Sequence, residues 1–391
     1  MSPTPVVAIL KKYNTKTEKD LTQMNNDNLK QIIQNYDEKL DLIYNSDHDE
    51  LFKWRAVQHF RTVWYAPENE TLPFAQRFNL AKKACSVLLD NSRMAPTNGV
   101  VKLAEVAEKE VEALFFNTLL ADDGGDIAVR QEHMEAFLIG MEELRVKHFP
   151  RSWKYKQDRH AASCYLCFFA PDDNFIYHYT EADKFAQYIE YGFDIGSGGS
   201  FRLDYYYQMC NEVIEELKQH PSLLEKQKKY LKDDSYYSDE SLHLLAFNLI
   251  WCTKTYHLHA GIEYLSKKES IKAHALAQLQ EKERLEKEEK INAILEEKEA
   301  LEANMALYAD IDLIGVQVTD HKTGDVGVIV SQDVNVVKVQ YGTTEKKYVI
   351  SKQFVLRPRF EDDEEIVEAL TAYGAMKQRL DDLTKELEKL Q

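Results

Sequence analysis

The chain has 391 residues, enough for two or three domains, and its composition excludes several kinds of protein. Hydrophobic residues make up 44% of it and aromatic residues 11%, so a sizeable buried core is expected rather than a disordered chain. The formal net charge of -17 argues against non-specific coating of nucleic acid, because phosphate binding requires cations. Any nucleic-acid contact is therefore expected to be local.

The sequence predicts a cytoplasmic protein without a membrane segment. Residues 1–14 lack an apolar run behind a basic start, so we expect no signal peptide, and no run of eighteen apolar residues occurs anywhere. The five cysteines are odd in number and thinly spread, which favours reduced thiols.

The region from about Asn14 to Ala260 has the pattern of successive helices. Apolar residues recur at intervals of three and four between Leu29 and Leu40, and Asp49–Tyr65 is apolar over more than half its girth, which predicts a helix near the centre of the core. Further helices are predicted over Phe74–Leu89, Val100–Leu120, Ile127–Phe149, Ala161–Phe168, Phe201–Gln219 and Ser241–Tyr256.

One segment of this region has the pattern of a strand. The aromatic run Phe175–Tyr179 predicts a short strand, after which Thr180 fits the N-cap of a further helix. The glycine cluster Gly192–Ser200 is expected to be a loop, and the Tyr- and Lys-rich stretch Lys226–Tyr237 a connection.

The pattern changes at about Leu258, where a long charged helix is predicted to begin. It would extend to Tyr308, about 75 Å at 1.5 Å per residue, with acidic residues placed four positions before lysines on its surface. Its distal part, residues 291–308, carries an apolar stripe with a spacing of three and four.

Alternating valines and turn glycines between Leu313 and Arg359 then predict four or five short strands, the size of an SH3-like barrel. The last segment, Glu364–Leu390, has heptad spacing, so we expect either antiparallel pairing with residues 291–308 or a homodimer through this helix. The fold class expected is mainly α. It comprises a helical body (1–257), a long coiled-coil arm (258–310), a small SH3-like β-barrel (311–360) and a C-terminal helix (361–391).

Motifs for catalysis and cofactors are weak, so we expect no enzyme, no cofactor and no metal. No phosphate-binding P-loop occurs, and the Gly192–Ser200 loop lacks the lysine and the preceding strand that such a loop needs. Cys164 and Cys167 would share one helical face with His160, but a zinc site needs a fourth ligand, and their apolar neighbours favour core packing. His257 and His259 have no nearby ligand partners at suitable spacing.

Two groups of basic and aromatic residues stand out from the acidic background as candidate contacts for nucleic acid or for a partner protein. The first mixes cations with stackable rings, and the second makes the predicted barrel mildly basic. The first group comprises Arg151, Trp153, Lys154, Tyr155, Lys156 and Arg159, and the second Lys338, Lys346, Lys347, Lys352, Arg357 and Arg359.

Several stretches together resemble a known helical module. Phe52–Phe60 with Trp64, Asp158–Leu166, Asn174–Thr180 and Asp234–Leu245 are similar, in the same order, to motifs of the module that precedes the motor domain in McrB-type restriction proteins. The likeness spans about residues 52–252 and implies a defence-type or DNA-processing system. The motor itself is absent, so motor function is not implied, and the module supplies no catalytic residues to transfer.

The predicted barrel has a likeness of its own. Gly315–Lys322, followed by Gly324 and Gly327, resembles the barrel appended to UvrD-type helicases, although the phenylalanine of that motif is missing and the glycine spacing is altered.

These observations favour a non-catalytic recognition or adaptor subunit of a bacterial antiviral or restriction-like system, which binds a partner protein, nucleic acid, or both. Two other classes stay open. One is a metal-dependent nuclease with a dispersed carboxylate site, and the other is a structural scaffold or dimerisation protein.

Overall fold

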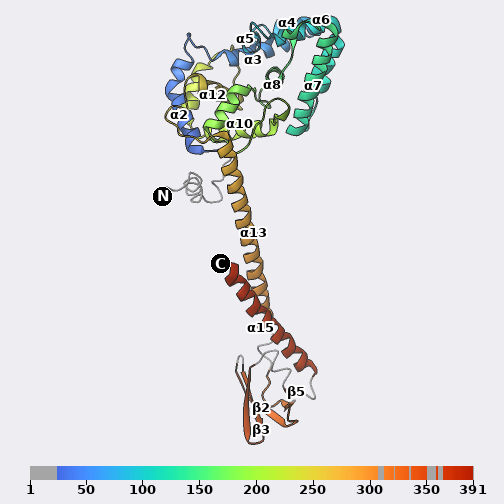
Figure 1. Ribbon diagram of the computed structural model, residues 1–391, viewed down its shortest axis with the longest axis vertical. Coiled ribbons are helices and arrows are strands. Elements are labelled where there is room, and N and C mark those ends of the chain that lie inside the picture. Colours follow the sequence, from blue (N-terminus) through green and yellow to red (C-terminus); the bar gives the residue numbers. More distant parts are fainter. Residues whose placement is uncertain are drawn as a thin grey trace. The chain divides into compact units, whose positions relative to one another are not determined.

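The computed structural model describes residues 24–306, 312–320, 322–333, 336–349, 358–359 and 364–390. The chain is mainly helical, with a small antiparallel sheet before the final helix (Figure 1). It divides into two compact units, Met1–Ala277 and Gln278–Gln391. Among the described residues, no helix is long and apolar enough to cross a membrane.

The first unit is the helical body. Its helices α6 and α7 run side by side at one end, and α2, α10 and α12 lie together at the other (Figure 1). Its helices are α2 (Asn26–Ile43), α3 (Phe52–Trp64), α4 (Phe74–Ala81), α5 (Ser86–Leu89), α6 (Pro96–Leu114), η3 (Phe115–Leu119), α7 (Ile127–His148), α8 (Arg159–Phe169), α9 (Tyr179–Tyr188), α10 (Leu203–Leu217), α11 (Pro221–Tyr230) and α12 (His243–Thr255), with short turns η2 (Pro67–Asn69), η4 (Trp153–Tyr155) and η5 (Gly198–Ser200).

Helices α2 and α3 confirm the periodicity seen in the sequence. The apolar stripe of α2 is fully buried, and Asn25 caps the helix by accepting from the N–H groups of Asp27 and Asn28. On α3, Phe60 and Trp64 stack on each other and meet further rings from α4 and α8. An aromatic core therefore joins α3, α4 and α8.

Several predicted boundaries need correction. The expected helix over Phe74–Leu89 is broken into α4 and α5 at residues 82–85. Helix α6 starts at Pro96, because proline fits the first turn of a helix, where its missing N–H is not needed. The stretch expected as a plain connection contains the second half of α11, which also begins with a proline at its first position.

The strand predicted over Phe175–Tyr179 is wrong, and so is the cap at Thr180. Phe175, Ile176 and Tyr177 lie buried but form no β ladder, and α9 starts at Tyr179 with His178 as the preceding residue. Side chains take the place of a neighbouring strand: Ser163 Oγ accepts from the Tyr177 N–H at 2.9 Å, and the Tyr206 hydroxyl donates to the Ile176 carbonyl at 2.6 Å. Buried backbone groups need partners, and here helices α8 and α10 supply them.

A connected polar network lies inside the body, between α2, α3 and α12. The Lys53 side chain is fully buried, forms an ion pair with Glu50 and donates to the Asn248 side chain at 2.7 Å. The Asn248 amide in turn donates to the Tyr36 hydroxyl at 2.8 Å, and the Tyr256 hydroxyl donates to Glu50 at 2.9 Å. The charge of Lys53 is therefore compensated within the core, as a buried charge must be.

Helix α13 (Lys267–Ala306) begins nine residues later than the predicted Leu258. Leu258 is instead buried in the core of the body, and Asn35 and Asn28 hold residues around it by donating to the carbonyls of Leu258 and Glu263. The N-terminus of α13 is held by Lys267, whose ammonium group lies 2.8 Å from Asp183 and 2.7 Å from Asp194. Residues 307 and 308, the end of the predicted helix, lie outside the described residues.

The second unit contains a five-stranded antiparallel sheet with the order β4-β3-β2-β1-β5. Its small core comprises alternate side chains of the strands, among them Val318, Ile329 and Val339, and Gly327 lets the Tyr341 ring pack closely against the sheet. The strands are β1 (Gln317–Asp320), β2 (Val326–Asp333), β3 (Val336–Tyr341), β4 (Thr344–Val349) and β5 (Pro358–Arg359).

The final helix, α15 (Glu364–Leu390), contacts both the sheet and α13 within this unit. Tyr373 packs against the core of the sheet. Further along, Arg379 holds Glu297 of α13 through two hydrogen bonds of 2.7 and 2.9 Å, and Lys298 donates to Thr384 at 2.9 Å. Part of α15 therefore lies beside residues 297–298 of α13, and Leu383 is fully buried there.

Candidate nucleic-acid interface

The first predicted group of basic and aromatic residues lies on the turn that follows α7. Trp153 opens the single-turn helix η4 and is 55% exposed, the most exposed large aromatic side chain of the described residues. Arg151, Lys154 and Lys156 are also exposed, and Lys147 adds a further exposed cation from the last turn of α7. We refer to residues 147–156 as the Trp153 surface.

The backbone of this surface is firmly anchored although its side chains are exposed. The Ala95 N–H donates to the Lys154 carbonyl at 2.9 Å, and the buried Gln157 amide donates to the carbonyls of Pro96 and Tyr155, both at 3.0 Å. Tyr155 turns inward and meets the Phe149 ring edge to face. The structure therefore holds Trp153 outward on a fixed support, and Tyr155 serves as part of that support.

The cations differ in their availability. Lys147, Arg151, Lys154 and Lys156 form no ion pair with any residue that the structure describes. Arg159, which the sequence placed with them, is held by both carboxylate oxygens of Glu135 at 2.6 and 2.8 Å. Its charge is neutralised on α7, so Arg159 does not belong to the available cations.

A shallow hollow of about 440 Å³ lies beside Trp153. Apolar and basic groups line it together, and most of its lining is apolar. The lining residues are Phe149, Pro150, Arg151, Ser152, Trp153 and Lys154. A flat ring with an attached anion matches this combination, because the ring would stack and the anion would meet a guanidinium or ammonium group.

The second predicted group is less available than its sequence indicates. On the sheet, Lys346 lies 2.6 Å from Asp320 and over the Tyr341 ring, and Lys338 lies 3.1 Å from Glu345. The contact with Lys346 lowers the pKa of Asp320 to about 2. Both lysines therefore have acidic partners on other strands of the sheet.

Of the other cations in this group, Lys347 is exposed on β4, opposite Lys338. Arg359 is paired through its backbone with Thr319. Lys352 and Arg357 lie outside the described residues.

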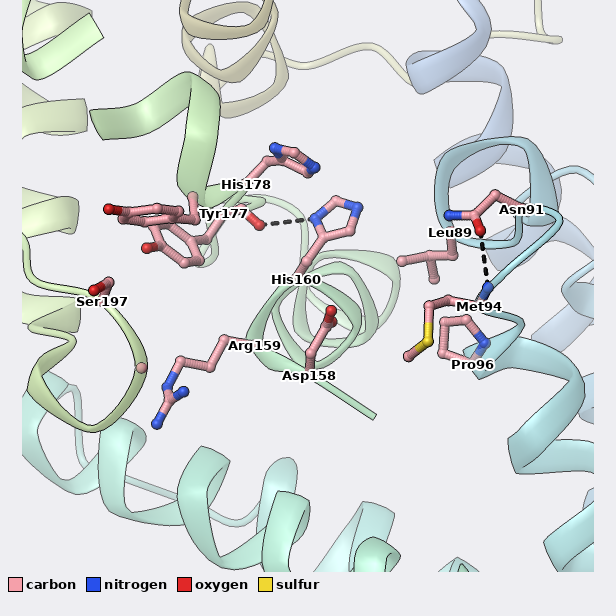
Figure 2. A pocket seen from close by; sticks show the side chains of 12 residues that line it. Leu89, Asn91, Met94, Pro96, Asp158, Arg159, His160, Tyr177, His178 and Ser197 are labelled. Carbon is pink, nitrogen blue, oxygen red and sulfur yellow. Dashed lines mark hydrogen bonds between the residues drawn. The ribbon is translucent and has the colours of Figure 1, made fainter. Parts of the chain in front are cut away.

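A cleft of about 360 Å³ lies next to the Trp153 surface and was not predicted (Figure 2). Arg159 and Ser197 lie on one side of it, Asn91 and Pro96 on the other, and His160 lies between them. His160 and His178 meet edge to face, with ring centroids 4.8 Å apart. These two histidines are eighteen positions apart and follow no motif, so spacing alone gives no signal for their meeting.

The histidines are already engaged by the protein. His160 Nδ1 donates to the Tyr177 carbonyl at 2.8 Å, and Nε2 lies 3.3 Å from the Leu88 carbonyl. Burial lowers the pKa of His160, and the neighbouring His178 lowers it further, so the ring is neutral at pH 7 and can donate from one nitrogen only. His178 is paired with Glu181 one helical turn later. The Nδ1–H of His160 therefore ties α8 to the backbone of the segment before α9.

The thiols near this cleft are buried. Cys164 Sγ lies 3.9 Å from His160 Nδ1, and burial raises the pKa of both Cys164 and Cys167. Thiols that resist deprotonation are poor metal ligands. Within the described ranges, no group of three or more His, Cys, Asp or Glu residues is placed to hold a metal ion.

Gly99 gives a direct test of how the Trp153 surface is supported. A Cβ atom at this position would lie 2.7 Å from the Tyr155 carbonyl oxygen and 2.9 Å from its Cα, so Gly99→Ala must displace the turn. We expect a loss of about 1–3 kcal/mol in the free energy of unfolding and altered accessibility of Trp153 to a soluble quencher. Gly199→Ala is the matched control, because a Cβ atom there meets nothing within 4 Å. Equal behaviour of the two variants would contradict the proposed support.

Comparison of the chain with models of protein families, with curated proteins and with solved structures gives no match.

Proposed function

We propose that this protein is a non-catalytic recognition subunit of a bacterial antiviral or restriction-like system, and that it binds nucleic acid through the Trp153 surface. The observation that carries the proposal is an exposed tryptophan among four cations that form no ion pair with the described residues, on a protein with a net charge of -17. On a protein with this net charge, most of the surface is expected to be negatively charged. A local reversal next to a stackable ring fits a phosphate backbone with bases.

The described geometry favours binding over catalysis. Apart from Pro150, the exposed side chains of the Trp153 surface are four cations and the Trp153 ring, which position phosphates and stack on bases but do not activate water. The neighbouring histidines are committed to backbone carbonyls and to Glu181. The resemblance of residues 52–252 to the McrB-type module, without its motor, adds the expectation that a separate protein carries out any reaction.

The second unit would supply a second contact. We interpret its sheet as an SH3-like barrel, and α13 with α15 as a coiled-coil hairpin that carries it. The ion pair between Arg379 and Glu297 supports this pairing, although both side chains are half exposed and the pair therefore contributes little to stability. Two linked weak contacts raise overall affinity through effective concentration. The binding partner at the barrel would be another protein of the same system.

A binding and cleavage assay tests the proposal. Purified full-length protein is incubated with fluorescent single- and double-stranded DNA and RNA, with and without magnesium or manganese. We expect binding without cleavage, and at least a tenfold loss of affinity when Arg151, Lys154 and Lys156 are all changed to glutamate. The matched control changes Lys30, Lys229 and Lys232, three exposed lysines elsewhere on the body, to glutamate and alters the net charge equally.

Two results would overturn the proposal. Cleavage that a single carboxylate substitution abolishes would establish a nuclease instead of a recognition subunit. Equal losses in the two triple variants would show that only net charge matters and that the Trp153 surface has no special role.

A further inference from the structure

The form of nucleic acid that fits the Trp153 surface follows from its size and shape. The surface offers one exposed ring, and the hollow of about 440 Å³ beside it is bounded by the turn itself. The turn that carries Trp153 is the three-residue helix η4 with its flanks, which is not a projecting helix or strand ribbon. Reading a duplex groove requires such a projecting element, whereas stacking on an unpaired base requires only an exposed ring.

The number of available cations also limits the ligand. Lys147, Arg151, Lys154 and Lys156 can neutralise about four phosphates at most. A B-form duplex carries one phosphate charge for each ~1.7 Å of its length, so a duplex of even one turn would carry about twenty. Most of those phosphate charges would lie too far from the four cations to be neutralised by them.

Acidic residues border the cations and would repel such an extension. Glu142 lies close enough to Arg145 and Lys156 that these two cations lower the pKa of its carboxyl group, Arg145 having the larger effect. Glu143 and Asp158 are exposed on either side of the same turn. A long, highly charged ligand is therefore opposed outside the few residues that attract it.

Resting on the proposed function, we infer that the Trp153 surface binds a short stretch of single-stranded nucleic acid, or an unpaired strand end, with one base stacked on Trp153. The adjacent phosphates contact Arg151, Lys154 and Lys156. The hollow beside the ring accommodates the stacked nucleotide. Backbone hydrogen bonds at Lys154 and Tyr155 fix the turn that carries the Trp153 ring, so little conformational entropy is lost when the ligand binds.

The test compares short oligonucleotides of one sequence, as single-stranded DNA, single-stranded RNA and blunt duplex, on the full-length protein across a range of salt concentrations. We expect both single strands to bind more tightly than the duplex. For the single strands, the slope of log affinity against log salt should be no steeper than about -3, which corresponds to four phosphates. Trp153→Ala should weaken single-strand binding by about 5- to 150-fold, and Trp153→Phe, which keeps a stackable ring, much less.

Tyr65→Ala is the matched control, because Tyr65 is similarly exposed, at 52%, but lies at the end of α3 away from these cations. Tighter binding of the duplex, lost with Trp153→Ala, would overturn the inference and leave the proposed function in place. A single-strand slope much steeper than -3 would also overturn it. No binding of any form, in protein whose helical circular dichroism is intact, would overturn both.

Discussion

Replacing Glu50 with alanine is expected to lower the free energy of unfolding by about 3–5 kcal/mol. Glu50 is the ion-pair partner of Lys53, whose side chain is fully buried. Without Glu50 the buried ammonium group retains the Asn248 carbonyl oxygen and loses its counter-charge. The Tyr256 hydroxyl would lose its acceptor as well. Breaking a buried pair on one side is costly because the remaining charge stays uncompensated.

Intrinsic tryptophan fluorescence in a urea titration measures this effect in the body alone, because Trp54, Trp64, Trp153 and Trp251 all lie in the first unit. Adding Lys53→Met to the Glu50→Ala variant should recover much of the loss, since the buried charge is then removed. Lys102→Ala breaks a half-exposed pair with Glu105 and serves as control, with an expected change in the free energy of unfolding far smaller than that of Glu50→Ala. A double variant as unstable as Glu50→Ala would contradict the ion-pair explanation.

The second large effect is expected at Asp239, which holds the start of α12. Its carboxylate accepts from the N–H groups of Leu244 and Leu245 at 3.0 and 2.8 Å, and from the Trp54 indole at 3.1 Å. Asp239→Ala leaves three buried donors without this acceptor, so we expect a loss of about 2–4 kcal/mol in the free energy of unfolding. The same fluorescence titration measures it.

Asp239 also predicts a pH dependence. Burial raises the pKa of its carboxyl group from 3.8 to about 7, although the three donors act in the opposite direction. Between these two pH values the folded protein holds a proton that the unfolded chain has released. The stability contributed by this group is therefore fully present below pH 3.8 and is lost as the pH rises toward about 7.

Asp239→Asn cannot ionise and should flatten this part of the stability profile while keeping one acceptor oxygen. The free energy of unfolding, measured by urea titration at several pH values between 4 and 7, compares the two proteins. Parallel profiles for Asp239→Asn and the unchanged protein would show that another group causes the dependence.

Local periodicity explains which parts of the fold could be predicted. The stripe from Leu29 to Leu40 and the dense apolar pattern of α3 require burial along one helix, and both are buried as expected. The Phe175–Tyr179 run has the composition of a strand, but its hydrogen-bond partners are Ser163 and Tyr206 from distant helices. Composition cannot reveal that side chains will replace a neighbouring strand, so tertiary contacts decided that segment.

The candidate site likewise has one part that the sequence predicts and another that it does not. Residues 151–156 stand out by composition, and four of them are exposed in the structure. The pairing of Arg159 with Glu135, and of Lys346 with Asp320, joins residues more than twenty positions apart and removes cations from the predicted groups. Likewise, the meeting of His160 with His178 depends on how α8 packs against the segment before α9. Packing between residues far apart in the sequence determines which cations remain unpaired, and this packing cannot be read from a single sequence.

Photo-crosslinking tests the central claim, nucleic-acid recognition through the Trp153 surface, most directly. Single-stranded oligonucleotides with a photoreactive uracil analogue are bound to the full-length protein, irradiated, and the adducts located by peptide mass spectrometry. We predict adducts on the peptide that contains Trp153, which are lost on competition with unlabelled strand. Adducts confined to the sheet strands β1–β4 or to the α13–α15 helices, with none on residues 147–156, would contradict the claim.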